Sequence, residues 1–308
     1  MNPLRSVAAL AALMGLACGG SGEAREDGAV VLHASNSAEL SALSRAFAEA
    51  QAAGAAHVEV VLAPGTYADT TLTLQDRGKP PTLQLDIRSA GPGPAILHNT
   101  RLSLQARAIS LEGLIVEDWQ GAESPVVLAV GESLSIAEVT FQRLAPQPHA
   151  TPAVHIKGLK RSGPKTIRIA DSWMRDSTAE QLILIDASAA DPVAEASLAR
   201  VGFVGNTAQT LLFGYALRAL HAEEIAAADP DVDSLLWCAW SENTVTLTGS
   251  ALTLSGRQPW LRRDANPPDP SVTFAEPVIT DSMIKPGGAA PDDAPEQPGE
   301  LLRWLQTP

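Results

Sequence analysis

The chain of 308 residues is poor in cysteine, in aromatic side chains and in positive charge. It has two cysteines, Cys18 and Cys238, and because Cys18 lies in a leader-like segment, no internal disulfide framework is available. Aromatic residues make up 4% of the chain, which suits a core of small aliphatic side chains. The 22 Lys and Arg are outnumbered by 35 Asp and Glu, and the net charge of −13 argues against nucleic acid as a general partner.

The chain also lacks the spacing that two common chemistries require. Its six histidines show no zinc-ligand spacing and have no cysteine cluster beside them. No glycine-rich loop of the phosphate-binding kind is present. A zinc enzyme and a nucleotide-binding fold are therefore not indicated.

The apolar run at residues 7–17 is too short to span a bilayer. It follows Arg5 and ends at Cys18 in the letters GLAC, which resemble a lipoprotein signal, although Leu16 lies two positions before the cysteine instead of three. We expect residues 1–18 to be a signal peptide, Cys18 to carry a lipid anchor in the membrane, and residues 19–30 to be a flexible tether. The protein would then be an exported lipoprotein, periplasmic or at the cell surface. The alternative is an ordinary signal peptide cut near Ala17, which gives a secreted protein.

One phrase recurs along the chain with apolar or small residues in the order h-x-h-x-x-h-x-h. The copies lie at residues 108–118, 132–142, 165–176, 195–205 and 243–254. In the first copy the apolar positions are Ile109, Leu111, Leu114 and Val116. Alternation within each half is typical of a strand with one buried face, and the two-residue interruption predicts a sharp corner. Gly113 and Gly249 occupy the second corner position, where glycine adopts a left-handed backbone most easily.

Repeats of this length predict an all-β fold, the single-stranded right-handed parallel β-helix of the pectin lyase-like kind. We place it at residues 31–264 and expect a monomer. The pattern from Ser37 to Ala53 predicts an amphipathic helix that caps the first rung. Residues 265–308 form a Pro-rich and acidic tail, in which VTFAEPVI predicts a last edge strand and LLRWLQ a small docking element.

The order of motifs resembles polysaccharide lyase family six, which includes chondroitinase B and alginate lyases. The segment 64–118, which begins PGTY and ends EGLIVED, carries most of the resemblance, and residues 168–188, 205–215 and 241–247 continue it. The resemblance implies β-elimination on uronate-containing chains, with calcium held by an Asn and two carboxylates, a Lys base, and an Arg.

Each implied role can be placed on this sequence. The Asn matches Asn206, and the carboxylate pair falls at Asp231 and Asp233 after a slip of one residue, although PDVDS is equally an ordinary acidic turn. The Lys position falls at Ala239, or at Cys238 with the same slip, so the base of the family is missing. Arg262 or Arg263 fills the Arg role, or else protects a solvated strand edge.

Further residues are candidates for contact with an acidic polysaccharide, and each of them also has a structural explanation. The basic ones could form a positive strip or a solvated loop, and the tryptophans could stack on sugars or pack in the core. The candidates are Lys157, Lys160, Arg161, Lys165, Arg168, Trp237, Trp240 and Trp260.

The sequence therefore supports two functional hypotheses. The first is a surface-anchored or secreted lyase-like protein that cleaves or only binds uronate-containing polysaccharide of the alginate or chondroitin type. The second is a non-enzymatic structural or adhesive β-helix of the cell envelope. Catalysis is left open, because a fold does not guarantee an activity and the base is missing.

Overall fold

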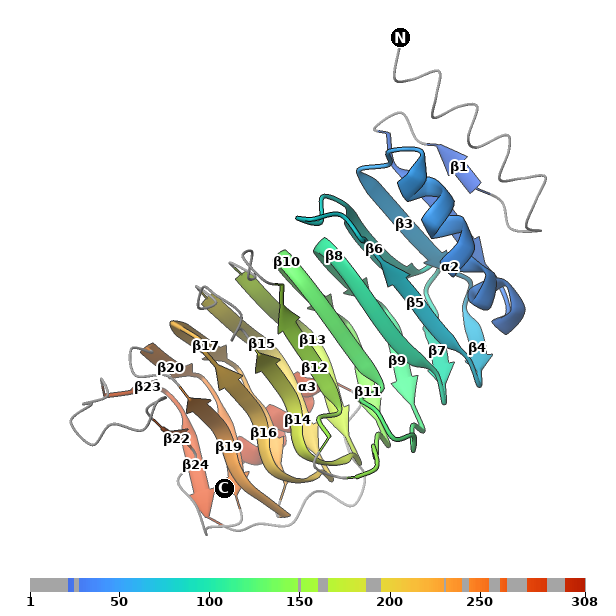
Figure 1. Ribbon diagram of the computed structural model, residues 1–308. Coiled ribbons are helices and arrows are strands. Elements are labelled where there is room, and N and C mark those ends of the chain that lie inside the picture. The colour runs from blue at the N-terminus through green and yellow to red at the C-terminus, as the bar shows by residue number, and fades with distance from the viewer. Residues whose placement is uncertain are drawn as a thin grey trace.

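The computed structural model describes residues 22–24, 28–148, 151–159, 166–186, 195–229, 231–239, 244–254, 261–264, 276–286 and 297–307. These residues form a right-handed parallel β-helix, in which each turn of the chain stacks on the turn before it (Figure 1). The predicted fold class is confirmed. The stack runs from a helix-covered N-terminal end to a C-terminal end formed by the last strands (Figure 1).

Three parallel sheets make up the walls of the solenoid, and we number them in chain order. Sheet 1 contains β2 (Val30–Ala34), β3 (His57–Leu62), β6 (Gln84–Ser89), β17 (Ala219–Glu223), β20 (Thr244–Thr248) and β23 (Val278–Thr280). Sheet 2 contains β4 (Gly65–Ala68), β7 (Ala95–His98), β9 (Leu114–Glu117), β11 (Thr140–Gln142), β18 (Ala226–Ala228), β21 (Ala251–Leu254) and β24 (Met283–Pro286). Sheet 3 contains β5 (Thr71–Gln75), β12 (Val154–Gly158), β14 (Thr178–Asp186), β16 (Thr207–Tyr215), β19 (Asp231–Ala239) and β22 (Leu261–Arg263).

Four longer strands bend around a corner and belong to two sheets each. The strands β8 (Arg101–Glu112) and β10 (Val126–Ala137) leave sheet 3 and enter sheet 1. The strands β13 (Thr166–Arg175) and β15 (Glu195–Val204) leave sheet 1 and enter sheet 2. Pairing is interrupted only briefly at the corners, as where the register of β8 and β10 shifts between Val130 and Ser133.

The repeated apolar phrase fills the core. Ile109, Leu111, Leu114 and Val116 are all buried, and each has a buried partner on the neighbouring rung in the same register. Apolar side chains of successive rungs stack on one another along the axis and are thereby removed from water. This burial is the main favourable contribution to folding.

The corner between sheets 1 and 2 needs one residue with a left-handed backbone in each of several rungs. Gly113 and Gly249 take this conformation, with φ of 65° and 59°, as predicted. Glycine is not required there, however, because Glu138, Asp171 and Arg200 adopt it too. In these rungs the ladder hydrogen bonds on both sides of the corner hold the residue in its conformation.

The N-terminal end of the core is covered by α2 (Ser37–Ala52). Its apolar side, which includes Leu40 and Phe47, is buried against the first rungs, as the sequence predicted. The helix begins at Ser37 as predicted, and its N-cap is Asn36, whose side chain accepts the hydrogen bond from the Glu39 N–H. Residues 22–24, which the sequence placed in a tether, form β1 (Gly22–Ala24) and pair antiparallel with β2.

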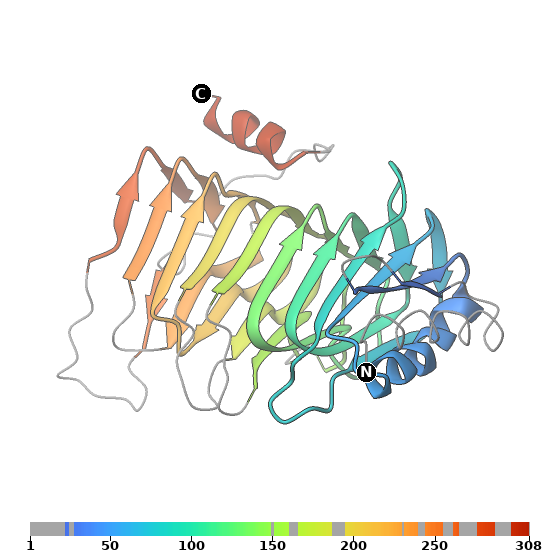
Figure 2. The ribbon, with the colours of Figure 1, turned by 90° about the horizontal axis from the view of Figure 1, so that it is seen from above.

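The predicted tail adds to the fold. The strands β23 and β24 pair with β20 and β21, so the solenoid continues beyond residue 264. The helix α3 (Pro298–Gln306) lies outside the coil (Figure 2) and buries Leu301, Leu302 and Leu305 against the outer face of sheet 2. The docking of LLRWLQ is thereby confirmed. In the described part of the chain, no helix combines the length and apolarity needed to cross a membrane.

Candidate functional site

A row of side chains follows the solenoid axis on the outer face of sheet 3, one from each of five strands in register. We call it the axial row; its members are His155, Leu184, Phe213, Trp237 and Arg262. All five are partly exposed, although the neighbouring positions on their strands are largely buried. Register places these side chains next to one another along the axis, because neighbouring strands lie about 4.8 Å apart.

The C-terminal half of the axial row is held by aromatic and cation–π contacts. The ring centroids of Phe213 and Trp237 lie 4.7 Å apart in an edge-to-face arrangement. The guanidinium carbon of Arg262 lies 3.9 Å from the centroid of the Trp237 ring. Asp264 fixes both groups, since its Oδ2 accepts hydrogen bonds from Trp237 Nε1 at 2.7 Å and from Arg262 Nε at 3.1 Å. The result is a pre-organised surface that combines apolar ring area with a cation.

A second row runs beside the first on the same outer face. Lys157, Asp186 and Tyr215 are in register on β12, β14 and β16, and all three are partly exposed. His155 of the axial row approaches this second row, with its Nε2 atom 4.0 Å from Asp186 Oδ2. Sheet 3 therefore brings two predicted glycan contacts, Lys157 and Trp237, and the predicted catalytic residue Arg262 onto one face.

Of the other predicted basic contacts, the structure describes Arg168, which does not share this face. Arg168 is exposed on the outer side of sheet 1. Arg175, next in the same cluster of the sequence, is on sheet 2, with its guanidinium carbon 5.1 Å from the centroid of the Trp173 ring. The structure thus divides the predicted basic strip among three sheets. Lys160, Arg161, Lys165, Trp240 and Trp260, and also Cys18, lie outside the described residues.

The two arginines proposed for one catalytic role face different surroundings. Arg262 contacts Trp237 on the outer face. Arg263 is in register with Cys238, whose side chain is fully buried, so Arg263 occupies a core-side position on the last rung of sheet 3. Only Arg262 is therefore placed to meet a ligand on the outer face.

The predicted metal ligand Asn206 is committed to the backbone of a corner. It is buried, its Oδ1 accepts from the Ser177 N–H at 3.1 Å, and its Nδ2 donates to Met174 O at 2.9 Å. Asp231, in contrast, is exposed at the start of β19; Asp233 is on the same strand, but its side chain lies outside the described residues. A buried amide whose oxygen already accepts a backbone N–H does not fit a calcium ion shared with an exposed carboxylate.

The partner of Asn206 is Asp229, a buried carboxyl that the sequence analysis missed. Its oxygens accept from the Asn206 N–H at 2.8 Å and from Asn206 Nδ2 at 3.2 and 3.3 Å. Burial raises the pKa of Asp229 to about 7, against the lowering effect of these hydrogen bonds. No local pattern distinguishes this Asp from the exposed ones around it, because its burial depends on the corner geometry.

The position expected for a catalytic base holds none. Cys238 is buried, and burial raises the pKa of its thiol to about 12, so it stays protonated at neutral pH. The alternative position is Ala239, which carries no titratable group.

Three side chains elsewhere bring possible metal-ligand atoms together, namely His98, Glu117 and Asp118. Arg143 already serves both carboxylates: its Nε and Nη2 donate to Asp118 at 2.6 and 2.8 Å, and its Nη2 donates to Glu117 at 2.8 Å. Hydrogen bonding to Arg143 lowers the pKa of Asp118. The cluster is an ion-pair network in which an arginine, and not a metal ion, neutralises the acids.

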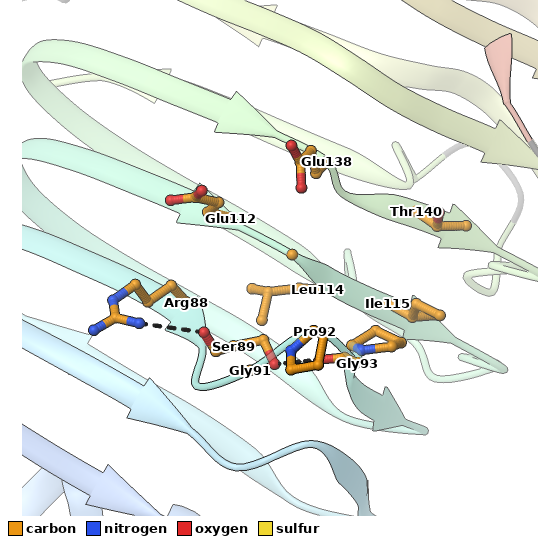
Figure 3. A pocket seen from close by; sticks show the side chains of 12 residues that line it. Arg88, Ser89, Gly91, Pro92, Gly93, Glu112, Leu114, Ile115, Glu138 and Thr140 are labelled. Carbon is orange, nitrogen blue, oxygen red and sulfur yellow. Dashed lines mark hydrogen bonds between the residues drawn. The ribbon is translucent and has the colours of Figure 1, made fainter.

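A depression of about 410 Å³ lies at the corner between sheets 1 and 2 (Figure 3). A loop containing Pro92 and Pro94 forms one side, and Glu112 and Glu138 lie on neighbouring rungs opposite it (Figure 3). Among the described residues, the side-chain carboxylates of Glu112 and Glu138 form no hydrogen bond or ion pair. The cation in this depression, Arg88, is bonded to Glu59 at 2.6 Å. The uncompensated negative charge of Glu112 and Glu138 in this depression would repel a polyanion.

Neither a protein-family model nor a curated protein sequence matches this chain. The resemblance to polysaccharide lyase family six therefore stays a prediction.

Proposed function

We propose that this protein binds acidic, uronate-containing polysaccharide along the outer face of sheet 3. A parallel β-helix is compatible with polysaccharide-active proteins. The observation that carries the proposal is the contact series Phe213, Trp237 and Arg262, in which aromatic rings and a cation are fixed on one exposed face.

The chemistry of such a ligand matches this face. The C–H faces of sugar rings pack on aromatic side chains, and sugar carboxylates pair with arginine and lysine. Lys157, which forms no ion pair with a described residue, supplies a cation at one end of the surface. Arg262 supplies another at the other end, although its Nε is bonded to Asp264. The cation of the acidic depression, Arg88, is bonded to Glu59. Binding along sheet 3 is consequently favoured over binding at that corner, despite the net negative charge of the chain.

Export and a lipid anchor on Cys18 are part of the same proposal and are supported by the sequence alone. They would hold a glycan-binding solenoid at an envelope surface, where acidic polysaccharides occur. Calcium has no role in it, since Asn206 does not fit as a ligand.

The proposal is tested by retention on immobilised alginate, chondroitin sulfate and dermatan sulfate, with uncharged dextran as the reference. We expect retention on an acidic polymer but not on dextran, and a marked loss with Trp237→Ala. The matched control is Trp304→Ala. Trp304 is 47% exposed on α3, and this helix packs against sheet 2, away from the proposed binding face. Equal retention of the wild type on dextran, or no retention at all, would contradict the proposal and favour a structural or adhesive role.

Cleavage is tested separately with the same polymers. Unsaturated uronate ends absorb in the ultraviolet, so a rise in absorbance at several pH values, with and without calcium, reports β-elimination. Because the base position holds Ala239 and a buried Cys238, we expect binding without a measurable product.

A further inference from the structure

The N-terminal end of the axial row differs chemically from its aromatic half. His155 on β12 is the first member of the row, and the next position toward the N-terminus is Val127 on β10. Lys157 has Ala129 beside it on β10. Because Val127 and Ala129 offer no polar side chain, the surface suited to a charged sugar ends at His155 and Lys157.

His155 has an unsatisfied polar atom. Its side chain is 17% exposed, and its buried Nε2 has no hydrogen-bond partner. Burial, with a smaller effect of Lys157, lowers the pKa of His155 to about 4, so the imidazole is neutral at neutral pH and Nε2 can donate or accept according to its tautomer. The charged groups acting on it are Lys157 and Asp186. A buried polar atom without a partner is costly, and a ligand hydroxyl would satisfy it once the imidazole turns this nitrogen toward the outer face.

Lys157 supplies the charge that His155 lacks. The two residues are separated by one position on β12, so their side chains lie on the same side of the strand. A sugar residue that places one hydroxyl against His155 therefore has its carboxylate within reach of a cation. Asp186, in register with Lys157 on β14, offers an acceptor for a further hydroxyl.

The spacing of the axial row is close to the repeat of an extended polysaccharide. Its five members span four strand intervals, or about 19 Å at about 4.8 Å each. One interval is close to the length of one hexopyranose residue in an extended polysaccharide. A chain parallel to the solenoid axis would thus meet one side chain of the row with each sugar.

Building on the proposed function, we infer that His155 and Lys157 form a terminal subsite for one uronate residue of a chain that runs along the axial row toward Arg262. Lys157 pairs with the carboxylate, and His155 Nε2 bonds a ring hydroxyl. The aromatic half of the row supplies the contacts for the remaining sugars.

A series of oligouronates from dimer to hexamer tests this inference by titration calorimetry. We expect the affinity of the wild type to rise up to the pentamer and then to level off. The variant Lys157→Met keeps the length of the side chain without its charge, and should bind the pentamer about tenfold more weakly while binding the dimer as the wild type does. The same pattern is expected for His155→Ala, with recovery in His155→Gln, whose amide can reach the same hydroxyl.

Two results separate the failure of this inference from that of the proposed function. If Trp237→Ala weakens pentamer binding but Lys157→Met and His155→Ala do not, the terminal subsite is refuted and the glycan surface stands. If none of the three variants changes affinity, both fail. A plateau already reached at the dimer would also overturn the axial orientation.

Discussion

The corner beside sheet 3 and the outer face of sheet 3 use polar and aromatic side chains in opposite ways. At the corner, Asn206 and Asp229 turn inward and bond backbone groups and each other. On the face, Trp237 and Arg262 turn outward and are held by one another and by Asp264. The corner stabilises the fold, whereas the face is organised and still partly exposed, so a polar residue in this solenoid is not a ligand-binding residue merely because it is polar.

The strongest test of this contrast is Asn206→Ala. The change removes the acceptor for Ser177, the donor to Met174 and a donor to buried Asp229, so we expect a loss of about 3 kcal/mol in the free energy of unfolding by urea denaturation. The exposed neighbour Thr207→Ala should cost little. Glycan affinity of the folded variant should be unchanged, and a parallel loss of affinity would mean that corner and face are not separate.

A second test uses the pH dependence of stability. The folded-state pKa of Asp229, about 7, lies above its unfolded value of about 3.9, so the folded state holds the proton more tightly. The contribution of this proton to the free energy of unfolding is complete below pH 4. It is lost as the pH rises toward 7, with a slope of at most about 1.4 kcal/mol per pH unit. In Asp229→Asn this slope should disappear from denaturation curves recorded between pH 4.5 and 8.

The control for that experiment is Asp231→Asn. Asp231 is exposed two residues further along the chain, so its removal should leave the pH profile of the wild type in place. An unchanged slope in Asp229→Asn would show that the buried carboxyl does not titrate in this range.

The face should respond in affinity more than in stability. Replacing Arg262 by Ala removes a cation–π contact and a charge, and we expect affinity for an acidic oligosaccharide to fall about fivefold, equivalent to about 1 kcal/mol. Lysine at this position should restore only part of the affinity, because it cannot stack as a plane. Full recovery with lysine would show that charge alone matters on this face.

The smallest effect is expected at the acidic depression. The double variant Glu112→Gln and Glu138→Gln removes two negative charges at a distance from sheet 3. We expect affinity for a polyanion to rise less than twofold at low salt and not at all at high salt, because exposed charges are screened over about 10 Å. A larger or salt-independent gain would place part of the glycan at this corner.

Much of the fold could be predicted because inward positions repeat locally, whereas one rung escaped recognition and another was predicted only as a single edge strand. The rung at 219–228 packs Leu220 and Ala222 inward but carries three consecutive alanines, which give weak alternation. The rung at 278–286 follows a segment rich in proline and acidic residues, and its Val278 and Ile279 are exposed. Periodicity identifies rungs only where large apolar residues mark them.

The site was less predictable because it depends on register between distant segments. Trp237 and Arg262 were candidates from their residue types, but His155 joins them only because the loops between strands set the stacking of β12, β14 and β16. Alternation also fails locally, since Leu211 and Leu212 are both buried and Phe213 then faces outward. Asn206 was misassigned because an amide that completes a corner has the same residue type as an amide that binds a metal.

The helix α2 has a consequence for the order in which the chain folds. It precedes the other rungs in the chain and covers the N-terminal end of the core, whereas among the described residues no further strand pairs with the last strands at the opposite end. Each later rung can therefore add to a template already in place as it leaves the ribosome, so folding proceeds in the direction of synthesis. A chain without α2 would expose the apolar N-terminal end of the core during growth and would be prone to association with other nascent chains.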